Sequence, residues 1–224
     1  MMANATYNSN LPLKYITISK WCERWLEEDY EKTARYAPNG LDTGRFTPVA
    51  RDFSGKKLRI LVEGNSDDYY KNVDESFKIV EKLDPERYEI WFMSYQGKPK
   101  DWYRVDKFLH RVPYAEVPQV YQQCHILLKS SILESFSYPP LEMMATGGVA
   151  VVAPNEGNIE YLRDGENCLL YEQGNIDSAV EVIERVRGDA QLRQRLYNGG
   201  LKTAQERDWN RVEADVLRLS LIHI

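Results

Sequence analysis

Residues 125–148 of the chain read HILLKSSILESFSYPPLEMMATGG. The first five, 125–129, form an apolar run with the length of a buried strand. Residues 138–146 are typical of a short helix, and Pro139 and Pro140 fall in its first turn, where their missing N–H groups cost little. The pair Gly147-Gly148 is a common helix end. This segment therefore predicts a strand, a loop and a helix in succession.

The same alternation continues on both sides of this segment. We expect strands at residues 13–19, 58–62, 88–94, 105–112, 149–153 and 167–171, and helices at 20–32, 72–83, 117–124, 158–163, 176–187, 190–207 and 209–221. Strands such as VAVVA (149–153) are apolar on both faces, as a sheet covered on both sides requires. Strands that alternate with helices indicate βαβ units. The predicted fold class is α/β, with a Rossmann-like parallel sheet flanked by helices.

Composition narrows the functional classes. The chain has 224 residues, of which 43% are hydrophobic and 28% charged, and its net charge is −5. This balance argues against a nucleic-acid binder, which is usually basic. No apolar run approaches the ~18 residues of a spanning helix, and residues 1–10 lack the order of a signal peptide. Three separate cysteines and three scattered histidines predict a cytoplasmic protein without a metal site.

Three loops should meet where the strands end, because ligands of parallel sheets bind outside the carboxyl ends of the strands. These loops are residues 63–72, 130–138 and 154–158. In the second, Glu134 lies at a strand end, where its carboxylate suits the hydroxyls of a sugar. The start of the following helix favours an anion such as a diphosphate. Glu142 follows one turn into that helix and suits a ribose diol.

These features coincide with a known pattern. The seven residues between Glu134 and Glu142 resemble the E-x7-E signature of group 1 (family 4) retaining glycosyltransferases, which have two Rossmann-like domains in the GT-B arrangement. Residues 36–48 resemble the "PNG-D…F-P" segment that joins the two halves of such enzymes. Residues 156–170 resemble the stretch that follows the signature. The resemblance covers residues 15–209, and its ordered motifs are more specific than the glutamate pair alone.

The resemblance implies a role for each matching residue. Glu134 would hold the transferred sugar, and Lys71 would neutralise the diphosphate and its leaving-group charge; these two are the candidate catalytic residues. Glu142 would bind the ribose. The remaining candidates for donor binding are the Phe136 and Ser137 N–H groups for the diphosphate, Gly64 and Asn65 in the first loop, and Gly157 and Asn158 as backbone contacts to the sugar. The family often has an arginine near Asn65, so Lys71 is expected to be the main cation.

The resemblance also implies a domain organisation. Residues 1–35 would be the remnant of an N-terminal acceptor domain, 36–57 an interdomain linker, 58–208 the donor-binding domain, and 209–224 a C-terminal helix and tail. Family members have a first domain of comparable size that carries a histidine, and none of the three histidines here matches it. We therefore interpret the chain as a fragment, or as a protein whose acceptor half comes from elsewhere.

The expected function is transfer of a hexosyl or deoxyhexosyl group, with retention, to a glycan or lipid-linked acceptor in cell-surface polysaccharide synthesis. The donor would be a UDP-, GDP- or dTDP-sugar, without a metal or another cofactor and without a nucleic-acid partner. The protein is expected in the cytoplasm, at the inner face of the membrane, with membrane association through the N-terminal domain that is largely missing from this chain. Two alternatives stay open, namely a non-catalytic nucleotide-sugar-binding subunit and a sugar-nucleotide epimerase.

Overall fold

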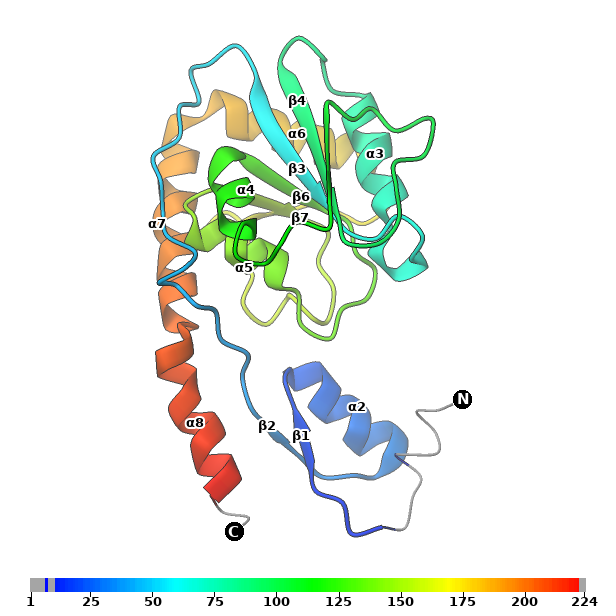
Figure 1. Ribbon diagram of the computed structural model, residues 1–224, viewed down its shortest axis with the longest axis vertical. Helices are drawn as coiled ribbons and strands as arrows, with labels where there is room; N and C mark the ends of the chain where they lie inside the picture. Colours follow the sequence, from blue (N-terminus) through cyan, green and yellow to red (C-terminus); the bar gives the residue numbers. More distant parts are fainter. Residues whose placement is uncertain (1–6, 8–10, 222–224) are drawn as a thin grey trace.

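The computed structural model describes residue 7 and residues 11–221 and has two parts (Figure 1). The small unit, residues 15–36, consists of β1 (Tyr15–Thr17), α2 (Lys20–Tyr30) and β2 (Ala34–Tyr36), and its two strands are parallel. The main domain, residues 58–206, holds the central sheet. The first and last segments of the sequence, residues 1–6, 8–10 and 222–224, lie outside this description, and so do the ends of the predicted N-terminal remnant and C-terminal tail.

The central sheet has six parallel strands in the order β5-β4-β3-β6-β7-β8. They are β3 (Leu58–Glu63), β4 (Tyr88–Ser94), β5 (Lys107–His110), β6 (Ile126–Lys129), β7 (Val149–Val152) and β8 (Leu169–Leu170). The first strand of this sheet, β3, lies in its middle. The next two, β4 and β5, are added on one side of β3, and β6, β7 and β8 follow on its other side. This order is that of a doubly wound dinucleotide-binding sheet, and its reversal point lies between β3 and β6.

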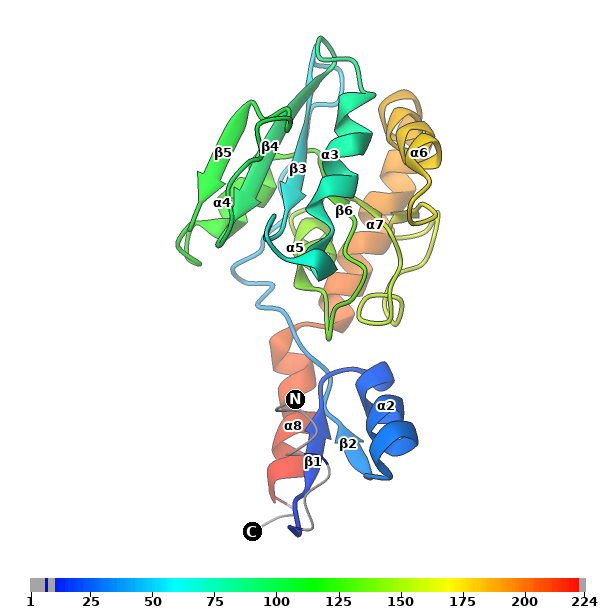
Figure 2. The ribbon, with the colours of Figure 1, turned by 90° about the vertical axis from the view of Figure 1, so that its right-hand side faces the viewer.

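Helices cover both faces of the sheet (Figure 2). One core joins α3 (Val73–Glu81) and α6 (Ile176–Gly188) to strand residues such as Ile60 and Leu128. The other joins α4 (Val117–Gln123) and α5 (Tyr138–Ala145) to Leu61 and Leu127. Because adjacent strand residues point to opposite faces, both faces of each central strand must be apolar. The predicted α/β class is therefore confirmed.

Two further helices complete the described chain. The helix α7 (Ala190–Glu206) packs on α5, and α8 (Trp209–Leu221) continues from it toward the level of the small unit (Figure 1). The backbone of Leu41 joins the α7–α8 junction, accepting from the Trp209 N–H at 2.9 Å and donating to the Arg207 carbonyl at 2.8 Å. The long connection from the small unit to the sheet is thereby attached to the end of the main domain.

Most predicted elements form close to their predicted positions, with three differences. Residues 158–163 form turns instead of a helix, because the segment folds around a buried Asn158. The short 3-10 helix η1 (Tyr69–Lys71) was not expected within the first loop. Strand β2 was not expected either, and it forms by pairing with β1, with Ala34 opposite Tyr15.

The connection between the two parts is anchored by a partly buried arginine. Arg51 donates to the Cys124 carbonyl at 2.6 Å and to the Tyr121 carbonyl at 2.9 Å, both at the end of α4. It also donates to the Thr146 carbonyl at the end of α5 and to the Val49 carbonyl. The last carbonyls of a helix have no partner within the helix. A single guanidinium therefore satisfies the ends of two helices.

Candidate functional site

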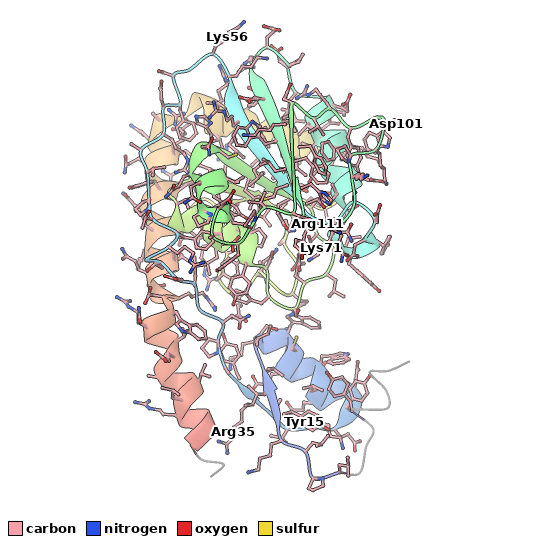
Figure 3. The ribbon with its side chains drawn as sticks, viewed as in Figure 1. Tyr15, Arg35, Lys56, Lys71, Asp101 and Arg111 are labelled. Carbon is pink, nitrogen blue, oxygen red and sulfur yellow. The ribbon has the colours of Figure 1, made fainter. Side chains whose placement is uncertain are left out.

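The candidate site lies at the carboxyl ends of β3 and β6, where the order of the sheet reverses. In sheets of this kind, ligands bind in the crevice between the loops that follow the two strands at this point. The first two predicted loops meet there, since the Ile132 N–H donates to the Tyr70 carbonyl at 2.8 Å. The third loop joins them through Asn155, whose amide donates to the Ser131 carbonyl at 2.8 Å. Figure 3 shows Lys71 in the half of the main domain nearer the small unit, with Lys56 at the far end.

The two predicted catalytic residues come together in this crevice. Lys71 Nζ lies 2.7 Å from Glu134 Oε2. Lys71 ends η1, and the N-cap residue Asp68 holds the start of η1 by accepting a hydrogen bond from the Tyr70 N–H at 2.8 Å. The Lys71 side chain keeps 31% of its surface exposed, whereas Glu134 keeps 10%. The lysine is therefore the more exposed of the two side chains, and the carboxylate is nearly buried.

A second ion pair, which the sequence did not predict, lies beneath the first. Lys129 ends β6 and is 1% exposed, and its Nζ lies 2.6 Å from Glu63 Oε2 at the end of β3. The same Nζ lies 3.5 Å from Glu134 Oε1. Burial alone would lower the pKa of Lys129, but the nearby charges of Glu63 and Glu134 outweigh it and raise that pKa. Lys129 is therefore charged. The four side chains Lys71, Glu134, Lys129 and Glu63 follow one another with alternating sign.

One oxygen of this cluster is left without a hydrogen bond. Within the described residues, Glu134 Oε1 is buried and accepts none, because the ion-pair distance of 3.5 Å to Lys129 is too long for a good hydrogen bond. Buried polar atoms normally have partners. A hydroxyl group in the crevice would satisfy this oxygen.

Glu142 lies on α5 beside the same crevice and is only 8% exposed. Burial raises its pKa to about 7, and the nearby charge of Glu63 acts in the same direction, while the Tyr121 hydroxyl and Lys129 partly oppose the shift. Its carboxyl group is therefore half ionised near neutral pH. A group held in this state costs the fold some stability, which suggests a role in binding.

A cavity of about 370 Å³ extends from Glu142 along the ends of β4 and β5. Its walls are mostly aromatic and aliphatic, and they include Met93, Tyr95, Val112, Tyr114, Tyr121 and Tyr138. Glu63 and Glu142 line it on the side of the ion pairs. Ligand sites are typically apolar cavities with a few polar groups. The cavity was not predicted, because its tyrosines come from four segments that only the fold brings together.

The start of α5 differs in one respect from the prediction. Ser137 is the N-cap residue, and its backbone N–H donates to the Gly157 carbonyl at 3.2 Å. This N–H is therefore engaged within the chain and is not available to a diphosphate in this geometry. The Phe136 N–H has no acceptor among the described residues. Of the two predicted amide donors, the Phe136 N–H is the one that a ligand can reach without breaking a protein hydrogen bond.

The third loop is held by hydrogen bonds of its own. Asn158 is 0% exposed, and its Oδ1 accepts a hydrogen bond from the Asn155 N–H at 2.9 Å. The Asn158 side chain is therefore an internal support of the loop, and the predicted backbone contact to a sugar stays a prediction. Gly157 lies against the second loop, where a Cβ atom would come within 2.2 Å of the Glu134 carbonyl oxygen. The two residues therefore position Glu134 and its neighbours.

Gly157→Ala tests this close approach. The added methyl group meets backbone atoms that cannot move alone, so we expect the free energy of unfolding to fall by about 1–3 kcal/mol. Urea denaturation measures the change. Gly188→Ala is the matched control, because nothing lies within 4 Å of a Cβ atom there. Equal stability of both variants and the unmodified protein would contradict the tight contact.

The first loop has the predicted glycine and asparagine in ordered positions. Gly64 has φ +149°, in a region that side chains disfavour, and a Cβ atom there would lie 2.9 Å from Val73 Cγ2. Asn65 Oδ1 accepts a hydrogen bond from the Asp67 N–H at 3.0 Å. Both residues shape the turn that carries η1 and Lys71. Their contact with a donor stays a prediction.

The small unit contacts two of the site loops. Trp21 Nε1 donates to the Ser135 carbonyl at 3.1 Å. Arg24 pairs with Glu156 at 2.9 Å. Trp21 therefore lies between the two parts of the structure, next to the predicted sugar-binding residue Glu134.

Within residue 7 and residues 11–221, no three His, Cys, Asp or Glu side chains come close enough to hold a metal ion. In the same residues, no helix combines the length and the apolar character needed to span a bilayer.

Parts of the sequence, and the fold, are similar to those of known proteins. Residues 106–203 match the family described as "Glycosyl transferases group 1". The Bacillus subtilis (strain 168) protein named "Putative glycosyltransferase EpsD" is 31% identical over 90 residues, which are 40% of this chain and 24% of that protein. The "O-antigen biosynthesis protein RfbC" of Myxococcus xanthus is 32% identical over 111 residues, which are 50% of this chain and 8% of that protein.

A solved structure supports the same comparison at the level of the fold. Anabaena Alr3699/HepE, determined in complex with UDP-glucose, aligns with a TM-score of 0.83 and 15% identity over 100% of this chain and 67% of that chain. At this identity the similarity concerns the fold alone. The present chain spans less than a third of either sequence relative.

Proposed function

Since residues 106–203 match the group 1 glycosyltransferases and the fold resembles the C-terminal half of GT-B enzymes, we propose that this chain binds a nucleoside-diphosphate sugar and supplies the donor side of glycosyl transfer. One observation carries the proposal. A fully assembled set of two lysines and three carboxylates lies at the reversal point of the sheet, beside an aromatic cavity.

The order of groups along the crevice suggests how the donor lies. The base would occupy the tyrosine-lined cavity, and the ribose diol would donate to Glu142 at the edge of that cavity. The diphosphate would lie at the start of α5, near the Phe136 N–H and Lys71. The sugar would then reach Glu134, whose Oε1 has no hydrogen bond in this structure.

The chemistry that we propose for the whole protein is transfer with retention, without a metal or another cofactor. When the bond between sugar and diphosphate breaks, negative charge develops on the leaving phosphate, and a preorganised cation stabilises it. Lys71 is the accessible cation of the site. The spacing of Glu134 and Glu142, which resembles the signature of retaining enzymes, supports the stereochemical part of the proposal.

We extend the proposal to the biological setting. A name such as "O-antigen biosynthesis protein" for one relative supports a glycan or lipid-linked acceptor and a role in surface polysaccharide synthesis. The donors of such reactions are cytoplasmic, so we expect the site to face the cytoplasm, with the acceptor brought to it at the membrane. Incubation with a labelled sugar donor and membrane extract, followed by detection of labelled glycolipid, tests this setting.

Calorimetric titration with UDP, GDP and dTDP tests the core of the proposal. We expect one of the three to bind the folded protein with a 1:1 stoichiometry. Neutral nucleosides should bind more weakly, because they lack the diphosphate. A folded sample that binds none of the three nucleotides would overturn the proposal.

Glu134→Ala separates sugar recognition from nucleotide binding. We expect the affinity for the free nucleotide to stay within about twofold, while the preference for the sugar nucleotide over the free nucleotide falls about tenfold, as for the loss of one charge-assisted hydrogen bond. Calorimetry with UDP and UDP-glucose provides both numbers. An equal loss of affinity for both ligands would contradict the role of Glu134.

A further inference from the structure

Each carboxylate oxygen of Glu134 has its own lysine. Lys71 Nζ lies 2.7 Å from Oε2, and Lys129 Nζ lies 3.5 Å from Oε1. The two lysines differ in accessibility, with 31% of the Lys71 side chain exposed and 1% of the Lys129 side chain. Lys129 is also fixed by Glu63, at 2.6 Å to the carboxylate and 3.2 Å to the carbonyl oxygen. One lysine can therefore leave Glu134, and the other cannot.

The proposed function gives Lys71 two incompatible partners. In this structure it neutralises Glu134, but in the donor complex it would neutralise a diphosphate. If Lys71 moved and nothing replaced it, a nearly buried carboxylate would lose its counter-ion beside a new negative charge. Such a group becomes neutral by taking up a proton. A protonated Glu134 would accept fewer hydrogen bonds from the sugar.

We propose that Lys129 is the positioning residue that keeps Glu134 ionised and in place while Lys71 transfers from Glu134 to the donor diphosphate. This inference rests on the proposed function of the site. Lys129 acts from below the crevice through Glu134 and does not touch the donor itself. Its position follows from the sheet, because Val62 pairs with Leu128 and the next residues, Glu63 and Lys129, are thereby neighbours.

A measurable consequence concerns protons. With Lys129 present, nucleotide binding leaves Glu134 charged, so binding takes up no proton at this residue. The charged and titratable groups that face Lys129 are Glu63 from β3, Glu134 from the loop after β6, and, at longer range, Glu142 from α5; Lys71 from η1 faces it across Glu134. Any test must therefore separate Glu134 from Glu142.

The experiment removes the buried pair as a unit. In Glu63→Gln/Lys129→Met, the charges of Glu63 and Lys129 disappear together, so no new unpaired charge comes from that pair. We expect UDP binding by this variant to take up to one proton more than binding by the unmodified protein. Calorimetry at pH 7.5 in two buffers of different ionisation enthalpy measures the uptake. When the pH falls by one unit, the affinity of the double variant for UDP should therefore rise by up to about tenfold more than the affinity of the unmodified protein.

Two controls assign the proton. If Glu134 takes up the extra proton, adding Glu134→Gln to the double variant should abolish the extra proton uptake. If Glu142 takes it up instead, the added substitution should leave the uptake unchanged. Lys56→Met removes a lysine whose exposed pair with Glu86 has a length of 2.9 Å, far from the site, and should change nothing. Persistence of the extra uptake in the triple variant would overturn the assignment to Glu134.

A second variant keeps the inference testable if the double variant does not fold. Lys71→Met removes the exposed lysine and leaves the buried pair intact. Without any nucleotide, the carbon-13 signal of the Glu134 carboxyl group should then still report the ionised form at pH 7. A protonated Glu134 in Lys71→Met would show that Lys129 does not suffice and would overturn the proposal.

The outcomes distinguish this inference from the function on which it rests. If the unmodified protein binds none of UDP, GDP and dTDP, the proposed function fails, and the role of Lys129 falls with it. If the unmodified protein binds UDP and the double variant binds it with the same proton uptake and pH profile, only the role of Lys129 is overturned. Binding with extra uptake that depends on Glu134 supports both.

Discussion

Glu142→Gln is expected to stabilise the folded protein at pH 8 while it weakens nucleotide binding. Glu142 is a buried carboxyl group, and burial raises its pKa from 4.5 to about 7. This difference corresponds to up to about 3 kcal/mol, because each pKa unit represents 1.36 kcal/mol. Glutamine has nearly the same shape and carries no charge, so the variant avoids most of this cost.

The size of this stability effect depends on pH. Below pH 4.5 the carboxyl group is neutral in both states, so Glu142 costs nothing there. As the pH rises from 4.5 to 7, the unfolded chain releases the proton first, and the fold loses stability. Above pH 7 the full loss persists. The stability advantage of Glu142→Gln should therefore be absent near pH 4.5 and largest above pH 7.

The affinity should change in the opposite direction. The ionised carboxylate accepts two hydrogen bonds from a diol better than an amide, which offers one oxygen. Bonds to charged groups contribute about 1.5–3 kcal/mol, so the affinity for UDP should fall about 10- to 100-fold. Urea denaturation and calorimetry at pH 5 and pH 8 measure both effects. A stabilised variant with unchanged affinity would remove Glu142 from the ribose site.

Much of the fold follows from local patterns. The apolar runs at 58–62, 125–129 and 149–153 predicted central strands, because parallel strands buried on both faces need continuous apolar residues. The position of Glu134 and Lys71 in loops after such strands then predicted that they would meet. They do, at 2.7 Å.

The remaining site residues depend on pairing that local patterns do not contain. Lys129 ends an apolar strand and meets Glu63, 66 positions earlier, only because β3 and β6 are neighbours in the sheet. The sequence did contain one signal for this residue, a lysine at the end of a buried strand. Its partner Glu63 could be identified only from the register in which β3 and β6 pair. The contacts of Ser137 and Asn158 depend on such pairing too, since a loop-to-loop contact engages the Ser137 N–H and Asn158 is buried.

The largest stability effect is expected for Arg51→Ala. The guanidinium donates to four carbonyl groups and to the Thr146 hydroxyl at 3.0 Å. Two of these carbonyls belong to the C-cap residues of α4 and α5, Cys124 and Thr146, where the helix dipoles favour a positive charge. Burial lowers the pKa of Arg51 to about 10, so the group stays charged and keeps its donors at neutral pH.

Alanine would remove all of these donors at once. The Tyr121 and Thr146 carbonyls would each keep one backbone donor at 3.1 Å, from the Cys124 and Val49 N–H groups. An unsatisfied buried acceptor costs about 1–3 kcal/mol, and a hydrogen bond to a charged group contributes about 1.5–3 kcal/mol. A cavity of about 430 Å³ beside Arg51 would admit water and relieve part of the loss. We therefore expect the free energy of unfolding to fall by about 3–4 kcal/mol.

Urea denaturation at pH 7 of three variants tests this account. Arg51→Lys keeps a charge but offers fewer donors in a different geometry, so it should recover only part of the loss. Arg185→Ala removes an exposed arginine of α6 and should stay within about 0.5 kcal/mol of the unmodified protein. A full recovery by lysine would mean that the charge at the two helix ends matters and the hydrogen-bond geometry does not. Equal stability of Arg51→Ala and Arg185→Ala would show that the guanidinium does not hold the two helices to the linker.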